Sequence, residues 1–135
     1  MEFDSISRQV IKTALKVHSE LGPGLFEEVY KVCLRHELNK AGLKALPEVG
    51  LPVTYDGVLL ELGYRIDLLV EDSLIVELKS VEHLGAVHKA QLLTYLKLAR
   101  KEVGLLLNFN TEHLRQGILR VVNTLPPSRP SRPSR

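Results

Sequence analysis

Cysteine, tryptophan and aromatic residues in general are scarce in this chain of 135 residues. Its one cysteine, Cys33, excludes an intrachain disulfide and argues against a thiolate metal cluster. We expect Cys33 to be a small, buried or half-buried residue on a helix. There is no tryptophan and aromatic residues make up 5% of the chain, so the sequence offers no evident stacking platform for single-stranded nucleic acid.

Long apolar stretches are also missing. No segment approaches the roughly 20 apolar residues that a membrane-spanning helix requires. The first residues, Met1-Glu2-Phe3-Asp4, include neither a basic segment nor an apolar run, so we expect no signal peptide. These absences predict a cytoplasmic protein that has no membrane partner.

A strong net charge is absent too. The chain has 18 basic and 16 acidic residues, a formal net charge of +2. Three of the basic residues are Arg129, Arg132 and Arg135 near the end of the chain, and without them 15 basic residues stand against 16 acidic ones. Bulk charge therefore does not favour nucleic-acid binding, which would need a local basic patch.

The length suits one domain with a single core. We predict that residues 1–125 form this domain, because from Pro126 the chain repeats Ser-Arg-Pro. Residues 126–135 are therefore predicted to be a disordered, low-complexity tail.

Two helices are predicted first. Asp4 or Ser5 can cap a helix that runs to about Leu21, where Gly22-Pro23-Gly24 ends it. A second helix is expected from about Phe26 to Ala41, followed by Gly42. The later elements are an extended segment at 44–55, a strand from Val58 to Val70 bent at Gly63, a strand from Leu74 to Lys79, a helix at 84–100, a strand at 103–108 and a last or edge strand at 116–123.

Asp56-Gly57 is a strong signal for a two-residue hairpin turn. The predicted order is α-α-β-β-β-α-β-β. This order indicates the α/β class, with a central mixed sheet flanked by helices.

The stretch Arg65–Lys79 reads as two apolar strands joined by a short acidic turn. Strand alternation places six apolar side chains on one face: Ile66, Leu68, Val70, Leu74, Val76 and Leu78. Four charged side chains share the other face: Arg65, Asp67, Glu77 and Lys79. If the turn is centred on Asp72, Asp67 lies opposite Glu77, with Cβ atoms roughly 5 Å apart.

Two facing carboxylates destabilise a sheet unless a cation lies between them. Carboxylate oxygens suit Mg²⁺ or Mn²⁺, and Lys79 could orient a water molecule or neutralise charge at a phosphodiester. The alternative is a solvated strand face with diagonal ion pairs, Asp67 with Lys79 and Arg65 with Glu77. The spacing alone leaves both interpretations open.

Two further groups of residues could join this hairpin. Glu27 and Tyr30 are three positions apart on one helical face, and Glu27 could approach the hairpin or simply interact with the helix dipole. On the later helix, Gln91 and Tyr95 follow His88 in a polar stripe. They could hydrogen-bond a phosphate or a water molecule, or form the solvent side of the helix.

Four segments together resemble a known family. Residues 18–30, HSELGPGLFEEVY, resemble the signature of the GxxExxY proteins, which belong to the PD-(D/E)XK nuclease superfamily. The similarity covers about residues 5–122. Its other segments are residues 64–70 with 75–79, similar to the catalytic hairpin, residues 91–97, similar to a downstream helix motif, and residues 104–109, similar to the strand that follows.

This resemblance implies a restriction-endonuclease-like core and a role for each residue of the site. Metal ligation is implied for Asp67, Glu77 and the backbone carbonyl of Leu78. Lys79 would be the catalytic lysine, Glu27 the acidic residue of the first core helix and Gln91 a supporting residue. Tyr30 and Tyr95 are expected to support them. The sequence departs from the pattern at two positions, Ile66 in place of a common Pro and Asn110 in place of an expected Gly, and neither removes a site residue.

The hypothesis is therefore a Mg²⁺- or Mn²⁺-dependent nuclease that hydrolyses phosphodiester bonds in DNA. The alternative is a non-catalytic nucleic-acid-binding or assembly module that retains the fold. Arg65, Lys89 and Lys97, with Arg100 and Lys101, could contact phosphates or form a solvated helix face. A single small domain offers limited DNA-binding surface, which favours a homodimer or a protein partner.

Overall fold

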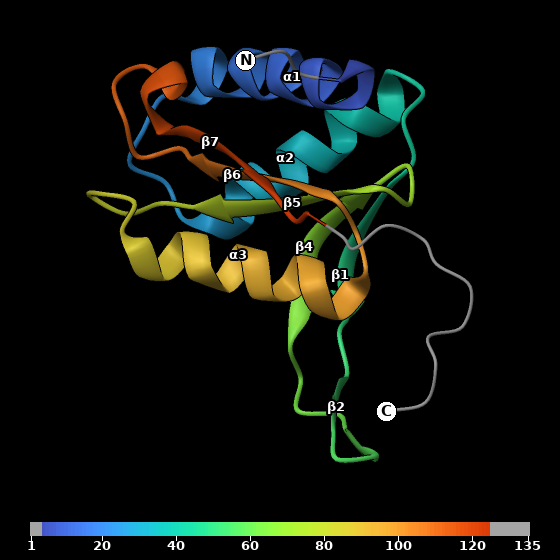
Figure 1. Ribbon diagram of the computed structural model, residues 1–135. Helices are drawn as coiled ribbons and strands as arrows, with labels where there is room; N and C mark the ends of the chain where they lie inside the picture. The colour runs from blue at the N-terminus through green and yellow to red at the C-terminus, as the bar shows by residue number, and fades with distance from the viewer. Residues whose placement is uncertain (1–3, 125–135) are drawn as a thin grey trace.

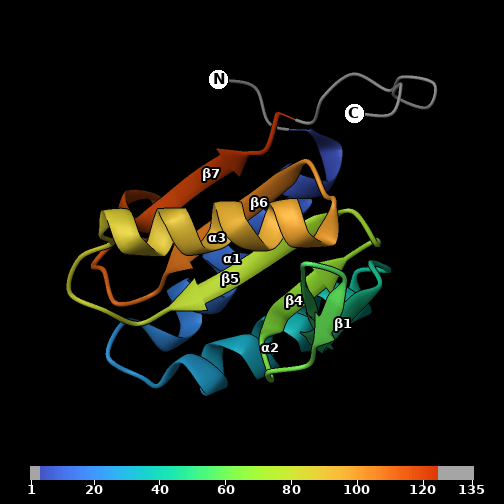
Figure 2. The same cartoon turned by 60° about the horizontal axis from the view of Figure 1, so that its bottom comes forward.

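A five-stranded sheet forms the centre of the computed structural model, which describes residues 4–124 (Figure 1). Helices α1 and α2 cover one face of the sheet and α3 covers the other, as Figures 1 and 2 show. The predicted tail at 126–135 lies outside the described residues. The elements are α1 (Ser5–Leu21), α2 (Glu27–Lys40), β1 (Ala45–Gly50), β2 (Val53–Tyr55), β3 (Val58–Leu60), β4 (Arg65–Val70), β5 (Leu74–Lys79), α3 (Ala86–Ala99), β6 (Val103–Asn108) and β7 (Ile118–Val122).

The strand order in the sheet is β1-β4-β5-β6-β7. Strand β5 pairs with β6 in parallel, and every other neighbouring pair is antiparallel. Helix α3 makes the connection that a parallel pair requires. The predicted α/β class with a mixed sheet between helices is confirmed, and the sheet is consistent with a restriction-endonuclease-like fold.

Local signals set the ends of the helices. The backbone N–H of Ser7 donates to the Oδ1 atom of Asp4 over 2.9 Å, so Asp4 caps α1 as predicted. Gly22 follows the helix with a φ of 70°, a conformation that favours glycine. Cys33 is half-buried on α2, as expected.

The strand predicted from Val58 to Val70 is wrong in one respect, because it is two strands. Gly63 has a φ of 83°, and the chain turns there instead of continuing. Strand β3 pairs only with β2, in a separate two-stranded sheet, while β4 joins the central sheet. Five strands therefore separate α2 from α3, where the sequence predicted three.

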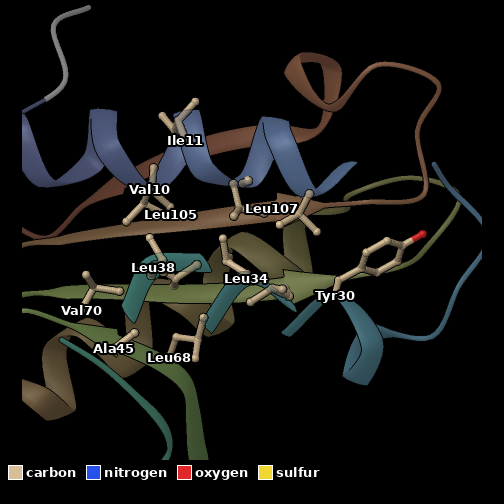
Figure 3. Packing of buried hydrophobic residues seen from close by; sticks show 14 of the residues in the cluster. Val10, Ile11, Tyr30, Leu34, Leu38, Ala45, Leu68, Val70, Leu105 and Leu107 are labelled. Carbon is tan, nitrogen blue, oxygen red and sulfur yellow. The ribbon is translucent and has the colours of Figure 1, made fainter. Parts of the chain in front are cut away.

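Apolar side chains form one cluster on each face of the sheet. The cluster under α1 and α2 includes Val10, Leu34, Leu68 and Leu105, all of them buried (Figure 3). The second cluster, under α3, has nine buried members: Leu51, Ile66, Leu69, Ile75, Leu92, Tyr95, Leu96, Leu106 and Val121.

Ile66 thus packs with the α3 cluster, not with Leu68 as strict alternation predicted. Pairing of β4 with β5 ends at Leu68 while its pairing with β1 continues to Arg65, and the strict two-residue alternation breaks between Leu68 and Ile66. Among residues 4–124, no helix is long and apolar enough to cross a membrane.

Candidate active site

The regular pairing of β4 with β5 stops where the two carboxylates begin. The ladder runs from Val70 opposite Leu74 to Leu68 opposite Val76, and one more step brings Asp67 opposite Glu77, as predicted. At that step the backbone N–H of Asp67 donates to the Oε2 atom of Glu77 over 2.9 Å. The N–H of Leu78 donates to the Oδ2 atom of Asp67, also over 2.9 Å.

These two bonds hold each carboxylate against the opposite strand, where a strand-to-strand bond would otherwise form. A carboxylate has about four lone-pair sites on its two oxygens, so both groups keep acceptor capacity for a ligand. The alternative interpretation, a strand face with diagonal ion pairs, is not what the structure shows. Neither Asp67 with Lys79 nor Arg65 with Glu77 is among the ion pairs of the described part of the chain.

Burial is the largest influence on the pKa of Glu77. Glu77 is only 4% exposed, and burial, reinforced by the nearby charge of Asp67, raises its pKa from the ordinary 4.5 to about 8. The Lys79 ammonium acts in the opposite direction and lowers that pKa. A cation at the two carboxylates would remove the penalty that both burial and like charge impose.

The donor chemistry fits a hard divalent ion. No group of three or more His, Cys, Asp and Glu side chains within residues 4–124 is placed to hold a metal. The available donors are therefore two carboxylates and the main chain beside them, all of them oxygen. Magnesium accepts one or two protein carboxylates and keeps several waters, so a set of this size suits it.

Lys79 and Gln91 meet at the end of β5. The Nζ atom of Lys79 lies 3.4 Å from the Oε1 atom of Gln91, to which it donates a long hydrogen bond. Gln91 comes from α3, so the lysine is held from the face of the sheet that this helix covers. The structure thus brings Gln91, expected as a supporting residue, next to the expected catalytic lysine.

Glu27 reaches the same end of β5 from α2. Its Oε2 atom accepts a 3.2 Å hydrogen bond from the backbone N–H of Ser80, the residue after Lys79. The Ser80 hydroxyl donates to the carbonyl of Leu25 over 2.8 Å, which ties the start of α2 to the end of the strand. Ser80 was not among the predicted site residues, because nothing in its local pattern signals this contact.

Tyr30 and Glu27, predicted to lie on one helical face, have different environments, because Glu27 is exposed and Tyr30 is not. It is fully buried and stacks on Phe109, with ring centroids 4.5 Å apart. Its hydroxyl donates to the carbonyl of Gly22 over 2.6 Å and accepts from the N–H of Leu25 over 3.1 Å. Tyr30 therefore shapes the loop that precedes Glu27.

The predicted polar stripe on α3 divides into three different environments. Gln91 is exposed, whereas Tyr95 is buried against the sheet. The Nδ1 atom of His88 accepts from the N–H of Gly85 over 2.9 Å, which serves the helix end. Burial raises the pKa of Tyr95, with further contributions from Glu77, Tyr64 and Asp67. Its ring meets that of Tyr64 edge-on at 6.3 Å.

Like Ser80, Asn108 was not among the predicted site residues; it was predicted only as the end of the strand at 103–108. It is buried and lies opposite Lys79 in the β5–β6 register. Its side chain accepts from the N–H of Val81 over 3.1 Å and donates to the carbonyl of Val81 over 2.9 Å. The signal was available: an asparagine at the end of an otherwise apolar, buried strand must find hydrogen-bond partners.

The predicted basic residues do not form one patch. Arg65, Lys89 and Lys97 are exposed, Arg65 at the start of β4 and the two lysines along α3. Lys101 instead pairs with Asp72, with its Nζ atom 3.3 Å from Oδ1. Asp72 lies in the β4–β5 turn, at the opposite end of the hairpin from Glu77, so Lys101 belongs to a different part of the surface.

Paired carboxylates and a lysine at the open end of a hairpin, in a mixed sheet between helices, are the features of a nuclease core of the restriction-endonuclease-like class. A family model for the PD-(D/E)XK nuclease superfamily matches residues 4–121. The chain therefore belongs to the PD-(D/E)XK nuclease superfamily. A comparison with curated proteins finds no match, and a comparison with solved structures finds none either.

Proposed function

We propose that this protein is a divalent-metal-dependent nuclease that hydrolyses phosphodiester bonds in DNA. The observation that carries the proposal is the cross-bonded pair of half-buried Asp67 and buried Glu77 beside Lys79. Superfamily membership supports nuclease-type function. We further propose that the chain is a GxxExxY-type member, with residues 1–125 as one nuclease domain.

Asp67, Glu77 and the backbone carbonyl of Leu78 would hold Mg²⁺ or Mn²⁺. When bound, such an ion polarises a phosphoryl oxygen and acidifies a bound water. The two N–H donors that hold the carboxylates orient them before any ligand arrives, which limits the cost of ordering them at the moment of binding.

Lys79 is the residue we assign to the reacting water and to the developing negative charge of the phosphate. Gln91, on α3, accepts a hydrogen bond from the ammonium group of Lys79. The Glu27 carboxylate accepts one from the backbone N–H of Ser80, the residue after Lys79. Besides burial, the charges of the two nearby carboxylates raise the pKa of Tyr95 on α3, and we assign it a supporting role on that side of the site. Arg65, exposed at the start of β4, is the basic residue we assign to the substrate backbone.

The test is cleavage of double-stranded DNA, single-stranded DNA and RNA by the purified full chain with Mg²⁺ or Mn²⁺. Removing a group that stabilises charge in a transition state typically costs roughly 100- to 1,000-fold in rate. We expect a loss of at least that size in Lys79→Ala, and also in Asp67→Asn and Glu77→Gln.

Matched controls come from the exposed face of α1. Lys12→Ala and Glu20→Gln remove the same kinds of group from exposed positions on a helix that supplies no residue of the site, and these variants should cleave at the wild-type rate. Cleavage that survives in all three site variants would contradict the assignment. Binding without cleavage on every substrate would favour the non-catalytic binding module instead.

A further inference from the structure

Residues 51–64 form an arm that projects beyond α3, away from the layers of the domain (Figure 1). The arm consists of β2, β3 and their flanking residues, and its two strands pair only with each other. A lone two-stranded hairpin is marginally stable in water at best. An arm of this kind is stabilised when a partner covers it.

Beyond Leu51, which packs in the α3 cluster, most apolar side chains of the arm are exposed. Tyr55 is 74% exposed and Leu62 is 63% exposed, and more than half of the surface of Val58 and of Leu59 is also exposed. Tyr64, at the base of the arm, is nearly half exposed. Contiguous exposed apolar residues on a small domain mark an interaction surface.

Charge excludes a phosphate backbone as the occupant of this surface. The arm carries Asp56 and Glu61 and has no lysine, arginine or histidine. Nucleic-acid affinity depends on basic groups that neutralise phosphates. The arm therefore suits a protein surface that is apolar and basic.

The outer face of α3 has this character. Val87, Ala90, Thr94 and Leu98 recur at intervals of three and four residues, which places them on one side of the helix. All four are exposed, and Val87 is 76% exposed. The helix carries Lys89 and Lys97 and has no aspartate or glutamate.

We infer that the arm of one copy of this chain packs on the outer face of α3 in a second copy, in a reciprocal, two-fold dimer. Figure 1 shows that the arm extends past the layer of α3, so each arm can reach the helix of a copy that faces it. A two-fold axis makes both contacts at once. Lys89 and Lys97 lie along one flank of α3 beside this face, from which their long side chains can extend towards the acidic residues of the partner arm.

The test is the molar mass of the full chain, measured by light scattering across a concentration series. Two variants are compared with the wild type. One reverses the charge of the arm, and the other reverses the charge of the helix. The arm variant is Asp56→Asn/Glu61→Lys, in which Asn suits the positive φ of position 56. The helix variant is Lys89→Glu/Lys97→Glu.

The wild type should be a dimer, and each variant alone should dissociate at least about tenfold more readily, because like charges then meet across the interface. An equimolar mixture should recover the dimer, since the basic arm now meets the acidic helix and the acidic arm the basic helix. Lys12→Glu on α1 should remain a dimer like the wild type.

A monomeric wild type would overturn the inference, and so would variants that stay dimeric or fail to recover in the mixture. Far-UV circular dichroism checks that each variant is folded. The measurement reads mass and not cleavage, so its failure leaves the proposed nuclease function untouched.

Discussion

Two hairpins in this protein turn through residues with similar positive φ angles, a two-residue loop between β2 and β3 and a three-residue loop between β4 and β5, but their strands lie in opposite environments. In β2–β3 the turn residues Asp56 and Gly57 have φ angles of 51° and 76°, and in β4–β5 Glu71 and Asp72 have 53° and 54°. The first hairpin projects from the domain, and most of its side chains are exposed. In the second hairpin, β5 lies between β4 and β6 in the sheet, and its side chains are buried on both faces of the sheet.

The difference shows that the turn determines a hairpin's register and the neighbouring elements determine its chemistry. Glu61 follows β3 and remains exposed, while Glu77 on β5 is covered on both sides and acquires a strongly raised pKa. A carboxylate becomes a candidate catalytic group in the second setting because desolvation, not sequence spacing, alters its ionisation.

The largest expected difference between the two hairpins is in stability. Ile75→Ala in β5 should lower the free energy of unfolding by roughly 2–5 kcal/mol, because the side chain is fully buried under α3. Leu59→Ala in β3 should change it by less than about 0.5 kcal/mol in the monomer. Urea unfolding of both variants at low protein concentration measures this, and equal losses would show that the arm is part of the core.

The second expected difference is in pH dependence. The pKa of Glu77 is higher in the folded state, about 8, than its ordinary 4.5, so the folded protein binds the extra proton between these values. The contribution of Glu77 to the free energy of unfolding of the metal-free protein should therefore be greatest below pH 4.5. It should fall as the pH rises towards 8.

Glu77→Gln should remove this slope, and Glu61→Gln should retain it. Chemical denaturation between pH 5 and pH 8.5, with a chelator present, makes the comparison. A slope that persists unchanged in Glu77→Gln would mean that another group controls the pH dependence and that Glu77 ionises normally.

The smallest expected effect lies in the turn of the arm. Gly57→Ala places a side chain at a φ of 76°, which costs about 1–2 kcal/mol. Because the arm contacts little of the domain, the cost should appear as faster hydrogen exchange of the amides of 53–60, with no change in the melting temperature. A clear drop in melting temperature would show that the arm unfolds together with the sheet.

Local signals in the sequence predicted much of the fold. The cap at Asp4, the break at Gly22 and the hairpin register centred on Asp72, one step beyond which Asp67 lies opposite Glu77, were all predicted from short stretches, and the structure confirms them. These features depend on backbone conformation within a few residues, so short patterns suffice to predict them.

Long-range contacts were not predictable in the same way. The contact of Glu27 with Ser80 joins residues 53 positions apart, and nothing in the local pattern of either residue signals it. The continuous strand predicted through Gly63 failed because a glycine alone does not show whether the chain bends or turns out of the sheet. Pairing partners decided that question.

By itself, the sequence determined the element types, the turn that aligns the two carboxylates and the residues that can carry nuclease chemistry, because each depends on neighbours along the chain. Only the tertiary structure decided that Glu77 is desolvated, that Gln91 meets Lys79 and that the β2–β3 arm remains uncovered. Burial and charge at a given atom depend on which distant segments pack against it, and that is a property of the whole fold.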